Sequence, residues 1–113
     1  MSEAANCLIL TASLAARDAM RYTPAGVPAL NLELTHASSV LEAGQLRQVK
    51  VGLKALALGS NAERLTSQAI GSRWRFTGFL ATPRNGKHVV FHIQEFSQDP
   101  SMSSPQDASV QVV

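Results

Sequence analysis

Apolar and polar residues alternate with a period of two along much of the chain, first at residues 6–14 and again at residues 29–36. Such a period is typical of strands that bury one face. The first strand would bury Leu8, Leu10, Ala12 and Leu14. Its outward positions would be Cys7, Ile9 and Thr11. A Pro-x-Gly-x-Pro stretch within residues 22–28 predicts a turn between the two strands.

The third predicted strand, residues 46–58, follows a polar connection at residues 42–45 that suits a hairpin loop. The strand is long, and Gly52 lies in its middle. Glycine inside a strand often marks a bulge or a sharp bend, as in a sheet that curls into a barrel. We therefore expect a distortion of the strand at Gly52.

A short helix of about two turns is predicted after the third strand. Ser60 and Glu63 have the spacing of a capping box, which would start this helix. Gly71 follows the last apolar position and can end it. The buried side of the helix would consist of Leu65, Ala69 and Ile70.

Two further strands are predicted at residues 73–82 and 88–96 from the same alternation. Between them, Asn85 and Gly86 form the dipeptide that is most typical of a tight hairpin turn. Trp74, Phe76 and Phe91 fall on apolar faces and are predicted to be core residues.

Three strands, a short helix and two more strands are the element order of the OB-fold, an all-β, five-stranded Greek-key barrel. The domain would span residues 6–97, after an N-terminal tail at residues 1–5. Residues 98–113 are rich in Ser, Pro, Gln and Asp, which predicts a flexible C-terminal tail. Periodicity alone leaves a five-stranded α+β sandwich as the alternative.

The composition excludes several classes of protein. Of the 113 residues, 45% are hydrophobic and 16% are charged, which excludes a disordered chain. No apolar run is long enough to span a membrane, and a single cysteine excludes an intramolecular disulfide. No nucleophile, phosphate-loop or metal-ligand motif is present, and His88 and His92 are too far apart on one strand to share a metal. We therefore expect a cytoplasmic protein that is not an enzyme and needs no cofactor.

The basic residues are concentrated in the predicted domain. All ten Lys and Arg lie within residues 6–97, together with five of the eight Asp and Glu, so the domain has a net charge of +5. A basic domain of this size suggests a polyanionic partner such as nucleic acid. A soluble domain with a small excess of basic residues is the alternative.

Six segments of the domain carry a resemblance to a known family: Asn6–Leu14, Thr23–Pro28, Leu32–His36, Glu42–Gly44, Gly71–Phe79 and Asn85–Lys87. Together they resemble the PriB family (primosomal replication protein N), bacterial single-stranded-DNA-binding proteins of replication restart, which are similar to the single-stranded-DNA-binding protein SSB. The resemblance implies an OB-fold homodimer that binds DNA and helps to restart stalled replication forks. It also implies contacts with the PriA helicase and, in some bacteria, with the loader protein DnaT and with SSB.

The candidate DNA contacts are basic residues and one exposed aromatic. Lys50 and Lys54 share the outer face of the third strand about 13 Å apart, close to the span of two phosphates. Tyr22, in the loop beside Arg21, is the best candidate for stacking on a base. The predicted contacts are Arg21, Tyr22, Arg47, Lys50, Lys54, Arg84 and Lys87.

The resemblance places the DNA-contacting basic positions of the family nearest to Arg21, Lys50, Arg84 and Lys87. Two departures weaken the match. Ala37 stands where the family has a basic residue, and Lys50 stands where it has a tryptophan. Stacking should therefore contribute less to binding, and charge should contribute more.

Cys7, Ile9 and Thr11 form an outward stripe on the first strand and are the predicted homodimer contacts. Two other functions remain open, an RNA-binding OB-fold module and a protein-interaction adaptor with secondary DNA contacts. The chain lacks the acidic, apolar tip with which SSB recruits partners, so we expect deletion of residues 100–113 to leave DNA and helicase binding unchanged.

Overall fold

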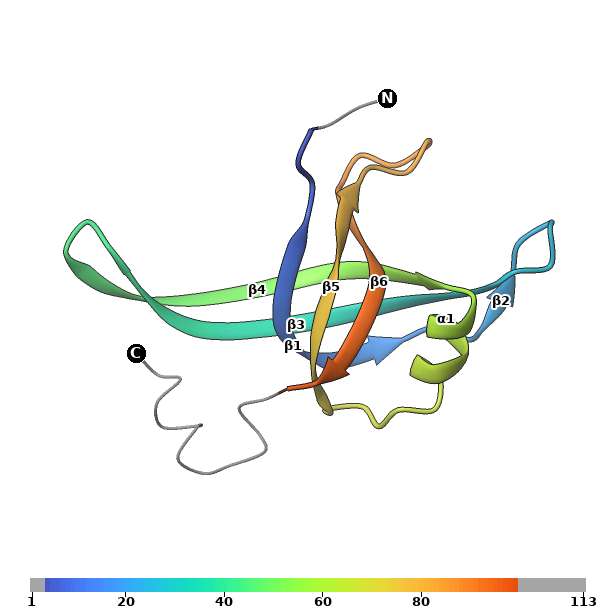
Figure 1. Ribbon diagram of the computed structural model, residues 1–113, viewed down its shortest axis with the longest axis horizontal. Coiled ribbons are helices and arrows are strands. Elements are labelled where there is room, and N and C mark those ends of the chain that lie inside the picture. The colour runs from blue at the N-terminus through green and yellow to red at the C-terminus, as the bar shows by residue number, and fades with distance from the viewer. Residues whose placement is uncertain (1–3, 100–113) are drawn as a thin grey trace.

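The computed structural model describes residues 4–99 and confirms the predicted all-β barrel with one short helix (Figure 1). The strand elements are β1 (Leu8–Arg17), β2 (Arg21–Tyr22), β3 (Pro28–Glu42), β4 (Gln45–Leu58), β5 (Arg73–Ala81) and β6 (Val90–Gln98). The helix α1 (Ser60–Leu65) lies between β4 and β5, as predicted. The two-residue strand β2 was not predicted, since Arg21 and Tyr22 were expected in a loop.

The barrel closes because β1 has two partners. Its first half, through Ser13, pairs antiparallel with β5, and its second half, from Ser13, pairs antiparallel with β3. A bulge between Leu14 and Ala16 marks the change of partner, because an extra residue bends a strand. The parallel pairing of β4 with β6 completes the circuit.

The inward positions of the strands fill the barrel. Leu30, Leu32 and Leu34 of β3 are buried, as their alternation predicted. Phe76 and Phe91 are fully buried, whereas Trp74 is half-buried at the edge of this core, where its ring meets Phe96 edge-on. The remaining buried apolar side chains are Ala12, Leu14, Ala29, Ala55, Ala57, Ala62, Leu65, Ile93 and Phe96.

The β3–β4 hairpin extends far beyond the barrel (Figure 1). Pairing of β3 with β1 stops at Thr35, but pairing with β4 continues in unbroken register to Glu42 and Gln45. We call residues 36–51 the arm. Ala43 and Gly44 form its two-residue turn, and both have positive φ. A turn of this kind matches the twist of the two strands that it joins. The predicted hairpin loop at residues 42–45 is thus confirmed, while the second strand is longer than predicted.

The predicted distortion at Gly52 is wrong. The β3–β4 register passes through Gly52 without a shift, and a Cβ at this position would meet no atom within 4 Å. A second bulge lies instead between Thr77 and Gly78, where β5 pairs with β6. A Cβ on Gly78 would overlap the carbonyl group of His92, so this glycine is required by close approach of the two strands.

The helix is shorter than predicted, and the capping box is wrong. Gly59, with φ of 69°, is the N-cap residue, and no side chain caps the helix. Ser60 is therefore already a helical residue. Leu65 is buried as predicted, but Ala69 and Ile70 lie beyond the helix and are exposed.

The connection between β5 and β6 is a loop of residues 82–89 rather than a two-residue turn. Its single turn is closed by a hydrogen bond of 3.0 Å from the Gly86 amide to the Pro83 carbonyl. His88 consequently lies in this loop and not on the strand that carries His92. The predicted C-terminal tail lies outside the described residues from residue 100 onward. Across residues 4–99 there is no helix of the length and apolarity that would cross a membrane.

Candidate nucleic-acid interface

The ten basic residues divide into those held by other groups of the protein and those that are not. Arg17 donates to the Gln68 carbonyl, Arg21 Nε donates to Asn31 Oδ1 at 3.1 Å, and Arg64 lies 4.2 Å from the centre of the Phe96 ring. Arg47 and Arg73 form ion pairs with Glu42 and Asp99, at 2.8 and 2.9 Å. Within residues 4–99, no hydrogen bond or ion pair is made by the side chains of Lys50, Lys54, Arg75, Arg84 and Lys87.

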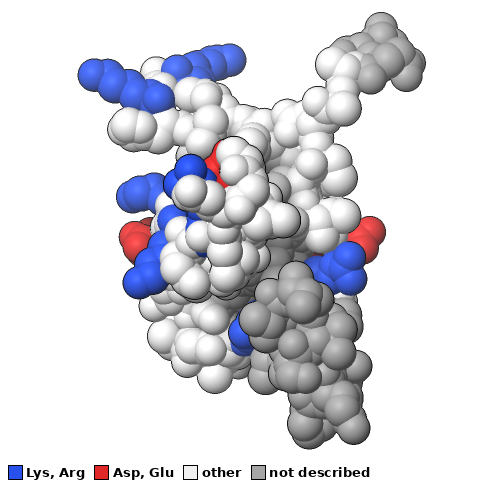
Figure 2. Space-filling model, turned by 90° about the vertical axis from the view of Figure 1, so that its left-hand side faces the viewer, with Lys and Arg blue, Asp and Glu red and all other residues white. Residues whose placement is uncertain are grey.

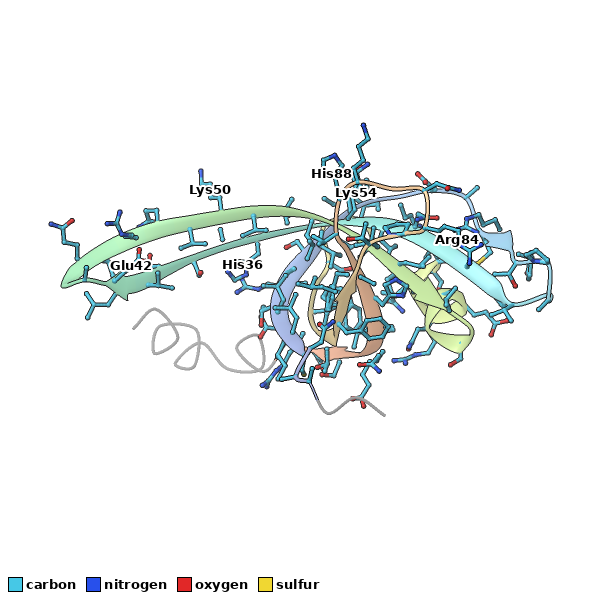
Figure 3. The ribbon with its side chains drawn as sticks, turned by 90° about the horizontal axis from the view of Figure 1, so that it is seen from above. His36, Glu42, Lys50, Lys54, Arg84 and His88 are labelled. Atoms are coloured by element: carbon cyan, nitrogen blue, oxygen red, sulfur yellow. The ribbon has the colours of Figure 1, made fainter. Side chains whose placement is uncertain are left out.

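Lys50 and Lys54 share one face of the β3–β4 hairpin, which we call the lysine face. Residues that pair across an antiparallel ladder lie on the same face, and the partners of the two lysines are Ala37 and Glu33. Both lysines are exposed and point the same way, whereas His36 points to the other side of the arm (Figure 3). The predicted placement of the two lysines on one face of the strand is therefore confirmed.

Arg47 lies on the opposite face from Lys50. It pairs with Val40 in the ladder, and its ion pair with Glu42 forms on that side. Arg47 is therefore not part of the lysine face, because residues three positions apart on a strand point to opposite faces. Arg75 is also separated, because its neighbours are Thr11 of β1 and Ser97 of β6.

The loop at residues 82–89, which carries Arg84 and Lys87, ends beside the strand that carries Lys54. This loop ends where β6 begins, and Phe91 of β6 pairs with Ala55, the residue after Lys54. In Figure 3, His88 lies on the same side as the lysines. Lys and Arg side chains gather along one side of the molecule in Figure 2.

Arg21 and Tyr22 lie on opposite faces of β2, and only Arg21 is on the face of the ladder that carries Glu33 and Lys54. Arg21 pairs with Ala29 and Tyr22 with Pro28, so both lie at the end of β3 that is remote from the arm. Tyr22 is 65% exposed and thus open to a base. A tight turn at Thr23–Gly26, closed by a hydrogen bond of 2.8 Å, holds this hairpin as the Pro and Gly residues predicted.

Two aromatic groups that the sequence analysis did not assign also lie on the outer surface. Phe79 and His92 pair across β5 and β6, with ring centroids 4.8 Å apart and planes inclined by 13°. Buried Phe91 and Ile93 flank His92 in sequence, so alternation alone indicates that His92 faces outward. Phe76 and Gly78 are buried on β5, so the same alternation indicates that Phe79 also faces outward.

The outward stripe on β1 lies beside an open strand edge. Cys7 is exposed, Ile9 is 55% exposed, and Thr11 is half-buried. In the described part of the chain, residues 8–12 pair with β5 on one edge and with no strand on the other. One carbonyl on β1 is already used, since His36 Nδ1 donates to the Thr11 carbonyl at 2.7 Å.

The structure brings no three His, Cys, Asp or Glu side chains of residues 4–99 together in a way that could hold a metal ion. The three histidines lie apart. His36 bonds to Thr11 and Ser38, His92 stacks on Phe79, and His88 lies in the loop before β6.

The comparisons with known proteins agree with this geometry. Residues 6–95 match a family described as "another single-strand binding protein family". The replication restart protein PriB of Bordetella pertussis is 43% identical over 91 residues, which cover 80% of this chain and 85% of that protein. PriB of Nitrosomonas europaea is 31% identical over 91 residues, covering 80% and 84%.

Solved structures give the same result. The PriB structure from Ralstonia solanacearum superposes with a TM-score of 0.77 at 42% identity, covering 84% of this chain and 98% of that one. The single-stranded DNA-binding protein of Thermus aquaticus is 25% identical with a TM-score of 0.69, and the match covers 88% of this chain and 52% of that one. The chain therefore belongs to the PriB family of replication restart proteins, within a wider single-strand binding protein family.

Proposed function

We propose that this protein is a homodimer that binds single-stranded DNA and the PriA helicase and so helps to restart stalled replication forks. Membership of the PriB family supports this role, and the distribution of unpaired cations supports the mode of DNA binding. DnaT and SSB are further partners in this proposal. The proposed site of action is the cytoplasm, and the protein acts by binding and not by catalysis.

The observation that carries the proposal is the set of basic side chains on one side of the barrel. The side chains of Lys50, Lys54, Arg84 and Lys87 make no hydrogen bond or ion pair within the described residues. Arg21 donates to a neutral amide and keeps its charge uncompensated. A phosphate backbone could run from the β2–β3 hairpin past Lys54 to Lys50. Phosphate contacts carry no base information, so sequence preference should be slight.

The proposed dimer forms at β1. The open edge of residues 8–12 offers unpaired backbone groups, and Ile9 adds an exposed apolar side chain beside it. Pairing with a second copy about a twofold axis would satisfy the edge and bury this stripe. Two copies would double the number of cations that one DNA strand can reach.

One experiment tests the DNA-binding proposal against the RNA alternative. Labelled single-stranded DNA, duplex DNA and RNA of one length are titrated with the protein at low and physiological salt, and binding is followed by fluorescence anisotropy. We expect the protein to bind single-stranded DNA more tightly than duplex DNA or RNA, and we expect this binding to weaken at higher salt. Absence of binding at low salt, or equal or tighter binding of RNA, would contradict the proposal.

One feature favours the adaptor alternative. Leu41 and Leu46 face each other at the tip of the arm and are 74% and 69% exposed. Exposed apolar pairs of this kind often contact other proteins. If the protein is mainly an adaptor, a Leu41→Ser and Leu46→Ser double variant should lose helicase binding in a pull-down assay while DNA binding is retained.

A further inference from the structure

An outward row of four side chains crosses the barrel between the candidate phosphate contacts. Phe79 of β5 pairs with His92 of β6, His92 is the parallel neighbour of Leu56 in β4, and Leu56 pairs with Asn31 in β3. All four are half-buried, so each keeps part of its surface open to solvent. Adjacent strands are about 4.8 Å apart, so the row is about 14 Å wide.

Gly78 fixes the first two members of the row. A Cβ at Gly78 would overlap the His92 carbonyl, and the bulge at this position shifts the register by one residue. The close approach brings the Phe79 ring onto the imidazole of His92, with the two planes nearly parallel. The required glycine therefore positions an aromatic pair on the outer face of the sheet.

Cations lie on two sides of this row. Arg21 donates to Asn31 Oδ1 at 3.1 Å, at one end of the row. Lys54 is two residues before Leu56 on the same face of β4, about 7 Å away. The loop that carries Arg84 joins the two strands that carry Phe79 and His92, and Figure 3 shows Arg84 in this loop.

We propose that Phe79, His92 and Leu56 form a platform on which bases of the bound strand stack, while the flanking cations hold its phosphates. This inference rests on the proposed function and names the base-contacting residues of the same site. The platform supplies the stacking surface that Lys50 cannot supply on the lysine face. Every base has a π-face, so the platform tolerates any sequence.

The test compares two strands of equal length, oligo(dT) and an abasic strand with the same phosphates. Phe79→Leu keeps an apolar side chain and removes the ring. It should lower the affinity for oligo(dT) about 5- to 150-fold, the range of base–aromatic stacking, and leave the affinity for the abasic strand within about twofold. Trp74→Leu, which removes an aromatic ring that packs on Phe96 in the core, is the matched control and should change the affinity for neither strand.

A rescue separates stacking from folding. His92→Gln should weaken oligo(dT) binding selectively, whereas His92→Phe, which keeps an aromatic ring, should restore it. Thermal unfolding of each variant confirms that it is folded before binding is measured. The platform is refuted if wild type binds oligo(dT) and Phe79→Leu binds it equally well, or if both strands are weakened to the same extent. Failure of wild type to bind either strand would instead remove the proposed function, and the platform with it.

Discussion

The lysine face can be tested by comparing two cations that are three residues apart on the same strand. Lys50 is exposed and its side chain makes no hydrogen bond or ion pair among residues 4–99, whereas Arg47 lies on the opposite face and forms an ion pair with Glu42 at 2.8 Å. The substitutions Lys50→Gln and Arg47→Gln each remove one positive charge. Because only Lys50 faces the proposed strand path, we expect only Lys50→Gln to change the salt dependence of DNA binding.

The expected size follows from counting phosphate contacts. Among residues 4–99, no hydrogen bond or ion pair is made by the side chains of Lys50 and Lys54 on the lysine face or of Arg84 and Lys87 in the loop at residues 82–89. Four contacts on single-stranded DNA give a slope of about −3 in log K against log salt. Loss of one contact flattens the slope by about 0.7, which corresponds to about fivefold weaker binding at 0.1 M salt relative to a 1 M reference. Arg47→Gln should leave both quantities unchanged.

The measurement is a fluorescence anisotropy titration of a labelled oligo(dT) at several salt concentrations, for wild type and both variants. Equal flattening in the two variants would show that the face does not matter and would refute the geometric reasoning. A wild-type slope close to zero would refute the electrostatic account as a whole.

Three further predictions concern the dimer, the barrel and Tyr22 of β2. Ile9→Glu places a charge beside the open edge of β1 and should convert the proposed dimer into monomers; an unchanged sedimentation coefficient would refute this. Gly78→Ala should cost about 1–3 kcal/mol by overlap with the His92 carbonyl, whereas Gly52→Ala, in open space, should cost nothing; thermal unfolding that ranks them otherwise would refute the assignment. Tyr22→Ala should weaken oligo(dT) binding less than tenfold, because charge carries most of the affinity; complete loss of binding would show that stacking dominates.

Much of the barrel could be predicted from local sequence pattern. The alternation of Leu30, Leu32 and Leu34 identifies a half-buried strand without reference to its partners, because side chains on a strand alternate between two faces. The same period assigns Lys50 and Lys54 to one face, and it also separates them from Arg47 once the strand is known. The turn at residues 43 and 44 is only partly local, because Gly44 adopts positive φ readily, whereas Ala43 is a non-glycine residue with positive φ.

Only the tertiary structure determines which groups lie against each of these positions. Gly52 and Gly78 have the same local signature, a glycine within an alternating strand, yet Gly52 faces open space and Gly78 lies against the His92 backbone. The difference arises from strand pairing between residues distant in sequence, which local pattern does not encode. For the same reason, only the fold pairs Arg73 with Asp99 and stacks Phe79 on His92, so only the fold separates the cations available to a ligand from those already neutralised.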